Sequence, residues 1–352
     1  MVSDRPLLDD SSQLSAEAAE HERLGAYGPA RALAHRALVM SIQQHGLDHL
    51  MTIACFHQAA HLEEVLADYP AARALAERAL NWSDASVGRN HPTTATSAAV
   101  LSQVLAIQGH HAASDALITQ AFTSFKKGQP RYALETARAL VALPVLLHRD
   151  QNYAATLPFY RTSLIAMEQQ LGPTHPELIG LLKVVAWATQ MGGRTADAVP
   201  LLDRALALAA DHLGTTHLTY ADLALERGRL AFAQMQREEA HDWYRQALTI
   251  RQTMLPAIHM GIAECLTRMA GTEADKEAIE ARYAAALTIT EQVFGPDHPA
   301  VGTALVTLGR HLAGTDLRLV RPYYERAYTI WEQTFGTEHS LTIYLRQQIT
   351  ML

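Results

Sequence analysis

The sequence lacks several features that mark common classes of protein. Only two of its 352 residues are cysteine, which excludes a disulfide framework. No apolar run approaches the roughly 20 residues that a membrane-spanning helix needs. Basic residues are outnumbered, at 29 Lys and Arg against 36 Asp and Glu, which argues against a nucleic-acid binder with a basic face. The first residues show no charged-then-apolar signal pattern, so we expect a cytoplasmic protein.

Prolines and β-branched runs are also scarce, whereas alanine and leucine are abundant. With 49% hydrophobic residues, this composition favours a helical chain that can bury a large core, in one long domain or two compact ones. The cysteines, Cys55 and Cys265, are far apart in the chain. We expect both to be buried and unpaired.

Histidine marks a repeat with a period of 42 residues. The motif LG-x-x-H stands at 171–175 and again at 213–217, and G-x-x-H-P or a close variant recurs elsewhere. We interpret these anchor histidines as structural turn residues between repeats. Ala133 occupies the one missing point of the grid, and the spacing shortens to 39 and 41 after the fifth histidine. The anchors are His49, His91, His175, His217, His259, His298 and His339.

A second run in each repeat keeps one position small, which indicates that another helix crosses there closely. Each repeat therefore predicts helix A, a turn, helix B and a turn, with neighbouring repeats stacked to bury their apolar faces. The small position is held by Ala37, Ala79, Ala121, Ser163, Ala205, Ala247, Ala286 and Ala327. The predicted repeats span about 5–46, 47–88, 89–130, 131–172, 173–214, 215–256, 257–295 and 296–336 of a single domain, 1–352, with a capping helix at 337–352.

Helix pairs with small residues at two helix-B positions, as at Ala30 and Ala37, resemble the tetratricopeptide repeat. The 42-residue period with LG-x-x-HP between units resembles its kinesin light chain subtype. The resemblance covers nearly the whole chain and implies an all-α, right-handed α-solenoid of about eight antiparallel helix pairs. HEAT-like repeats of similar period are the structural alternative. The coiled-coil heptads of kinesin light chain are absent, so only the repeat subtype is inferred.

Two faces of helix A follow from counting residues after the anchor histidine. Positions 7, 10, 11 and 14 share one face and predict the packing surface, with a small residue at position 11. Positions 5, 8, 12 and 15 form a second face, here called the A-helix stripe. The resemblance implies that this stripe lines a concave, ligand-binding groove. Its candidate groove residues are Arg138, Lys183, Trp187, Gln190, Arg229, Phe232 and Arg310.

Cations and aromatics alternate on this stripe. Arg138, Lys183 and Arg229 fall in three successive repeats, and Trp187 and Phe232 lie among them. A guanidinium beside an aromatic ring suits a carboxylate- or phosphate-bearing ligand with an apolar part. An acidic peptide with an aromatic anchor fits, and is similar to what kinesin light chain repeats recognise; ordinary solvated charges are the alternative. Position 9 lacks the asparagines with which family members hold an extended peptide, which favours a compact ligand.

A second candidate site is His57, His61 and Glu64 in the second repeat. Histidines four residues apart share a helix face and can bind one metal ion, to which Glu64 adds an oxygen. This reading makes the protein an enzyme or a small-molecule or metal-binding sensor. No nucleophile arrangement or phosphate-binding loop is recognisable.

The favoured hypothesis is a non-catalytic scaffold, without a cofactor, that binds a protein or peptide partner. A subunit whose exposed helix faces are buried in a larger complex is a further alternative. Arg227 falls on the packing face and is expected to pair with Glu226 or Asp222. The seventh repeat lacks three residues and has Gly271 at position 12, so we expect its helix A to end early and open a notch.

Overall fold

The computed structural model describes residues 10–128, 133–142, 153–313 and 317–352. These residues form helices and connecting turns, and no strand occurs in the ranges described. The fold divides into two compact units, Met1–Gln151 and Asn152–Leu352, and the division falls inside the fourth predicted repeat. No helix in the described ranges is long and apolar enough to cross a membrane.

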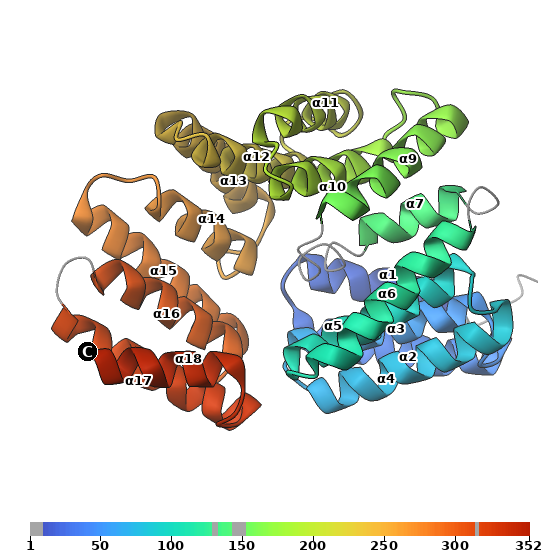
Figure 1. Cartoon of the computed structure of the whole chain (residues 1–352), viewed down its shortest axis with the longest axis horizontal. Helices are drawn as coiled ribbons and strands as arrows, with labels where there is room; N and C mark the ends of the chain where they lie inside the picture. Colours follow the sequence, from blue (N-terminus) through green and yellow to red (C-terminus); the bar gives the residue numbers. More distant parts are fainter. Residues whose placement is uncertain (1–9, 129–132, 143–152, 314–316) are drawn as a thin grey trace, which may run out of the picture. The chain divides into compact units, whose positions relative to one another are not determined.

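In the first unit, helices pack in consecutive antiparallel pairs, and each helix B also packs against the next helix A (Figure 1). The pairs are α1 with α2, α3 with α4, and α5 with α6. The bounds are α1 (Ser11–Arg23), α2 (Tyr27–His45), α3 (Leu50–Val65), α4 (Tyr69–Val87), α5 (Pro92–Ile107), α6 (His111–Gly128) and α7 (Ala133–Ala142).

The second unit continues the same arrangement, with pairs from α10 and α11 to α16 and α17. The last helix, α18, packs on α17, where the sequence predicts a capping helix. The predicted all-α solenoid of paired helices is confirmed. The bounds are α9 (Tyr153–Leu171), α10 (Leu178–Met191), α11 (Thr195–Leu213), α12 (Leu218–Ala233), α13 (Arg237–Met254), α14 (Met260–Ala270), α15 (Lys276–Phe294), α16 (Pro299–Ala313), α17 (Leu317–Phe335) and α18 (Ser340–Met351).

The anchor histidines accept a backbone hydrogen bond at or just before the start of the A helices. At His49, for example, the backbone N–H of Met51 donates to Nδ1 of the imidazole at 3.2 Å. All seven anchors accept the same bond from the residue two positions on, at 2.9–3.3 Å. A side-chain acceptor at this position satisfies an N–H that the helix leaves without a partner. The structural interpretation of these histidines is therefore supported by one repeated contact.

The rest of the LG-x-x-H motif shapes the turn before the cap. Its glycine has a positive φ at each of six turns between repeats, for example 90° at Gly172 and 88° at Gly214, a conformation that glycine adopts at little cost. The residue before the glycine ends helix B, and where it is aromatic it stacks on the anchor imidazole. Phe294 and His298 have ring centroids 4.4 Å apart, and Phe335 and His339 4.6 Å.

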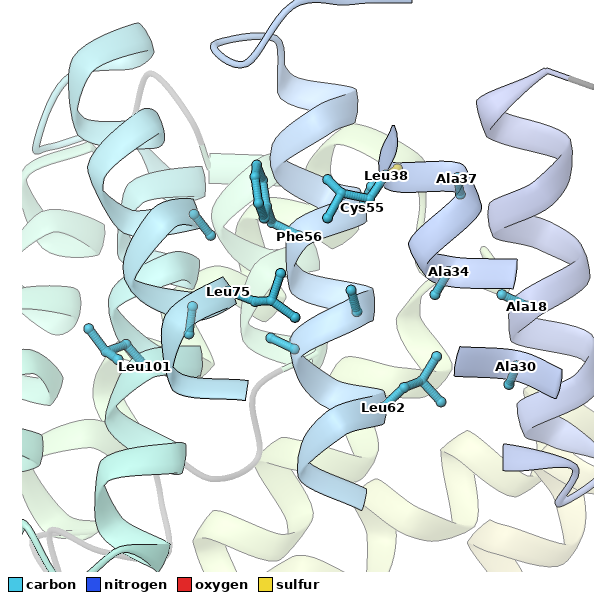
Figure 2. Packing of buried hydrophobic residues seen from close by; sticks show 14 of the residues in the cluster. Ala18, Ala30, Ala34, Ala37, Leu38, Cys55, Phe56, Leu62, Leu75 and Leu101 are labelled. Carbon is cyan, nitrogen blue, oxygen red and sulfur yellow. The ribbon is translucent and has the colours of Figure 1, made fainter. Parts of the chain in front are cut away.

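Close packing between helices explains the small positions of both helices. Ala30, Ala34 and Ala37 of α2 are fully buried next to Ala18 of α1 (Figure 2). In the fifth repeat, the predicted packing face of α10 is buried throughout, together with most of the rest of that helix; the residues of this face are Leu182, Val185, Ala186 and Thr189. Cys55 and Cys265 are free and buried, as expected.

Position 11 of helix A meets an aromatic ring of helix B in two repeats. A Cβ at Gly228 would lie 2.5 Å from Cε1 of Tyr244, and one at Gly309 would lie 2.6 Å from Cε1 of Tyr324. The second repeat holds alanine at the equivalent positions, Ala60 and Ala76. At Gly228 and Gly309, therefore, any larger residue would collide with the tyrosine ring.

The prediction for Arg227 is wrong. Its guanidinium pairs with Asp203 of α11 at 2.9 Å and with Glu239 of α13 at 3.0 Å, rather than with Glu226 or Asp222. A residue on the packing face points toward the neighbouring B helices, whereas an adjacent residue on the same helix faces elsewhere. The early end of helix A in the seventh repeat is confirmed, because α14 has 11 residues and α12 has 16.

Candidate functional site

The A-helix stripe of the second unit contains six of the seven candidate groove residues. On α10, Lys183 and Gln190 are half-buried, but Trp187 is only 8% exposed. Most of the indole therefore belongs to the core, and only a small part of it is available to a ligand.

On α12 the stripe is more open. Arg229 is half-buried and donates from Nη1 to Oε2 of Glu226 at 2.6 Å, one helical turn before it. Phe232 is 41% exposed, which is unusual for a phenylalanine in this chain. A guanidinium and an exposed aromatic ring therefore lie one turn apart, as the sequence predicts.

The remaining two candidates are on other helices. Arg310 is exposed on α16, where it stacks 5.6 Å above the ring of Tyr344 and donates to its hydroxyl at 3.3 Å. Arg138 is exposed on α7, in the first unit. Among the described residues, Arg310 is thus engaged with the last helix.

The three candidate metal ligands each bond to a different residue. Nε2 of His57 lies 2.8 Å from Oγ of Ser97, and Nε2 of His61 lies 2.9 Å from Oε1 of Glu22. Glu64 accepts from Nε2 of Gln103 at 2.5 Å. Within the described ranges, no group of three or more histidine, cysteine or acidic side chains could hold a metal ion.

These contacts create different electrostatics for the two histidines. Burial lowers the pKa of His57 to about 4, whereas the hydrogen bond to Glu22 raises the pKa of His61. Burial raises the pKa of Glu64, and the bond from Gln103 opposes that shift. Glu22–His61 and Glu64–Gln103 join position 15 of one repeat to position 12 of the next, 39 residues on. We call these two contacts the polar ladder.

A buried arginine is a feature that the sequence analysis missed. Arg251 of α13 is 6% exposed and pairs with Asp222 of α12 at 2.7 Å and with Glu264 of α14 at 3.1 Å. Both carboxylates are on the A-helix stripe. The arginine, which comes from the B helix between them in sequence, therefore joins two neighbouring A helices. The signal was present, because equivalent helix-B positions hold small or apolar residues such as Ser41, Ser83 and Met167.

A buried glutamate was missed as well. Glu63 is 5% exposed at position 14, on the packing face, and its Oε1 lies 2.6 Å from Nε2 of His35. Arg31 approaches its other oxygen at 3.6 Å. Other repeats hold leucine or threonine at this position, for example Leu105 and Thr189. This cluster joins α2 to α3.

Comparison with known proteins agrees with this architecture. The family model described as "Tetratricopeptide repeat" matches residues 53–127, 135–211 and 277–333. No curated protein sequence matches the chain.

Solved structures share the fold at low identity. A Rap protein complexed with Competence and Sporulation Factor is 10% identical, with 97% of this chain and 99% of that chain covered and a TM-score of 0.56. The Rap conjugation gene regulator of plasmid pLS20, in complex with the Phr* peptide, is 15% identical, with 94% and 92% covered and a TM-score of 0.52.

The structural neighbours also include kinesin light chain-like repeat proteins. The repeats of a putative kinesin light chain from Podosopora anserina are 17% identical, with 69% of this chain and 95% of that chain covered and a TM-score of 0.35. At these identities the two Rap structures show the fold alone.

Proposed function

Since this chain belongs to the tetratricopeptide repeat family, we propose that it is a non-catalytic scaffold that binds a peptide or protein segment on its A-helix stripe. The observation that carries the proposal is the contrast between the faces of helix A. The packing face of α10 is buried throughout, whereas Lys183, Arg229 and Phe232 of the stripe retain exposed polar or aromatic surface.

Two structural neighbours are peptide- or factor-bound Rap proteins, which supports this use of the fold. The charges indicate what a partner would carry. Lys183 and Arg229 favour carboxylates, but Glu226 lies beside Arg229, and Asp222 and Glu264 lie farther along the stripe. A partner with a few placed carboxylates and an apolar anchor fits this mixture better than a uniformly acidic one.

The test is a selection of random-sequence peptides, displayed on phage, against the purified full chain. Synthetic copies of the enriched peptides are then titrated against Lys183→Gln and Arg229→Gln. We expect each substitution to weaken binding about tenfold, since each removes a charge partner of the ligand.

Arg245→Gln is the matched control. Arg245 pairs with Asp242 three residues before it, as Arg229 pairs with Glu226, but it lies on helix B. Circular dichroism melts establish that all variants fold. Enrichment of no peptide, or equal weakening by all three substitutions, would remove the stripe as the binding surface.

A further inference from the structure

The contact of the polar ladder is missing between the sixth and seventh repeats. Phe232 stands at position 15 of the sixth repeat and Gly271 at position 12 of the seventh, 39 residues on. The same spacing joins Glu22 to His61 and Glu64 to Gln103. At Gly271, however, α14 has already ended and no side chain is present.

The absence of a side chain leaves the phenylalanine ring uncovered. A Cβ at Gly271 would lie 4.0 Å from Cζ of Phe232, so the edge of the ring faces the bare glycine. Phe232 is 41% exposed, and Met235, in the turn that follows α12, is 76% exposed. Both residues therefore expose a large apolar side chain to water, at a free-energy cost.

Positive charge borders this surface on both helices. Arg229 precedes Phe232 by one turn of α12, and Arg268 precedes Gly271 by one turn of α14. Both guanidiniums act on the same buried hydroxyl: burial raises the pKa of Tyr244 to about 12, Arg268 and Arg229 oppose that rise, and the nearby Glu226 and Glu264 add to it. Arg229 is paired with Glu226, whereas Arg268 is exposed and has no ion pair among the described residues.

We propose that Phe232, Met235 and Gly271 form a subsite for one apolar side chain of the bound peptide, and that Arg268 binds a carboxylate next to that side chain. The occupant is a peptide segment in which a leucine- or phenylalanine-sized residue adjoins a carboxylate. Burial of that side chain against Phe232 covers the open ring, and the carboxylate supplies the partner that Arg268 lacks. This inference rests on the proposed function and identifies the part of the partner that confers specificity.

The subsite can be filled without straining the backbone. Gly271 has φ −68° and ψ −15°, which any residue adopts, and a Cβ added there would meet its nearest atoms at ordinary contact distances. In Gly271→Leu the new side chain lies against Phe232 and occupies the place of the ligand's apolar group. Gly192→Leu is the matched control, because Gly192 follows α10 with a similar backbone, φ −73° and ψ 10°.

The experiment uses the peptides enriched by the full chain. We expect them to share an apolar residue next to a carboxylate, and we expect Gly271→Leu and Arg268→Gln each to weaken binding about tenfold or more while Gly192→Leu leaves it unchanged. Each peptide is synthesised with a free and with an amidated C-terminus, and with its acidic side chains replaced by amides. Loss on amidation assigns the terminal carboxylate, and loss on side-chain replacement assigns an internal one.

The outcomes separate the subsite from the scaffold. If Lys183→Gln weakens binding but Gly271→Leu and Arg268→Gln do not, the subsite is overturned and the proposed function stands. Binding that is insensitive to every carboxylate replacement overturns the role of Arg268. Enrichment of no peptide overturns both proposals.

Discussion

Position 15 of one repeat and position 12 of the next are joined by a hydrogen bond in one region of the molecule and are not joined in another. In the second and third repeats, position 12 bonds to position 15 of the repeat before it, through Glu22–His61 and Glu64–Gln103. In the seventh repeat the equivalent residues are Phe232 and Gly271, and the ring stays exposed. The side chains at these two positions and the early end of α14 therefore decide whether neighbouring repeats bond to each other or leave apolar surface exposed.

The largest expected effect concerns two glycines of the open region. Gly228→Ala places a Cβ 2.5 Å from the buried ring of Tyr244 and is expected to lower the free energy of unfolding by about 2 to 3 kcal/mol. Gly271→Ala, whose Cβ would meet its nearest atoms at ordinary contact distances of 3.4 and 4.0 Å, is expected to change it by less than about 0.5 kcal/mol. Urea unfolding followed by circular dichroism measures both. Equal effects would show that the gap at Gly271 is not open.

Acid should destabilise the region with the polar ladder through His57. The folded pKa is about 4 against 6.5 for the ordinary side chain, so between these pH values the unfolded chain binds more protons and stability falls as the pH falls. At about 1.4 kcal/mol per pKa unit, the loss attributable to His57 is about 3 kcal/mol. His57→Gln should remove this part of the pH dependence, and urea unfolding at pH 7.5 and pH 4 measures it as the difference from the unsubstituted protein.

His61, one helical turn on, should titrate in the opposite sense. Its pKa is raised by Glu22, so its stabilising contribution is complete below the ordinary pKa and is lost as the pH rises through the folded value. His61→Gln should therefore cost more stability at pH 5 than at pH 8. The anchor histidines remain in both proteins and form a common background. A larger cost at pH 8 would contradict the assigned bond to Glu22.

Breaking the polar ladder should cost less. Gln103→Leu removes the donor to Glu64 and leaves a carboxylate whose pKa burial has already raised, so we expect a loss of about 1 kcal/mol. Gln190→Leu, on the stripe of α10, is the comparison substitution and is expected to cost about half as much or less. Thermal unfolding of the two variants tests whether the ladder contributes to stability or merely accompanies the packing.

The smallest effect should be equal in the two regions. Ala67 and Met235 both occupy the turn after helix A with positive φ, 61° and 64°, where Gly109 and Gly193 stand in other repeats. Replacement of either residue by glycine relieves a strained conformation and should stabilise the protein by about 0.5 to 1 kcal/mol. Equal gains in chemical unfolding would confirm that the backbone of both regions is the same. A gain at only one turn would mean that the regions differ beyond their side chains.

Much of the fold could be predicted because each residue can be compared with those at the equivalent positions of the other repeats. A small residue held at one position through eight repeats identifies helix crossings, and the anchor histidines divide the repeats. The missing residues before Ile279 predicted the early end of α14 in the same way. The candidate site was harder to predict, because Trp187 and Phe232 occupy the same stripe but differ in exposure, 8% against 41%.

The sequence by itself determined the helix pairs, their caps, the packing face and the position of the irregular repeat, since each depends on local spacing and on residue size. Only the tertiary structure decided which side chains meet between repeats: Arg227 with Asp203 and Glu239, Arg251 with Asp222 and Glu264, and Phe232 with a glycine. The physical reason is that periodicity assigns a residue to a face of its helix, whereas its partners depend on how the neighbouring helices are rotated and how long they are. The ring of Phe232 is exposed because α14 ends early beside it, whereas a longer A helix would continue past this point.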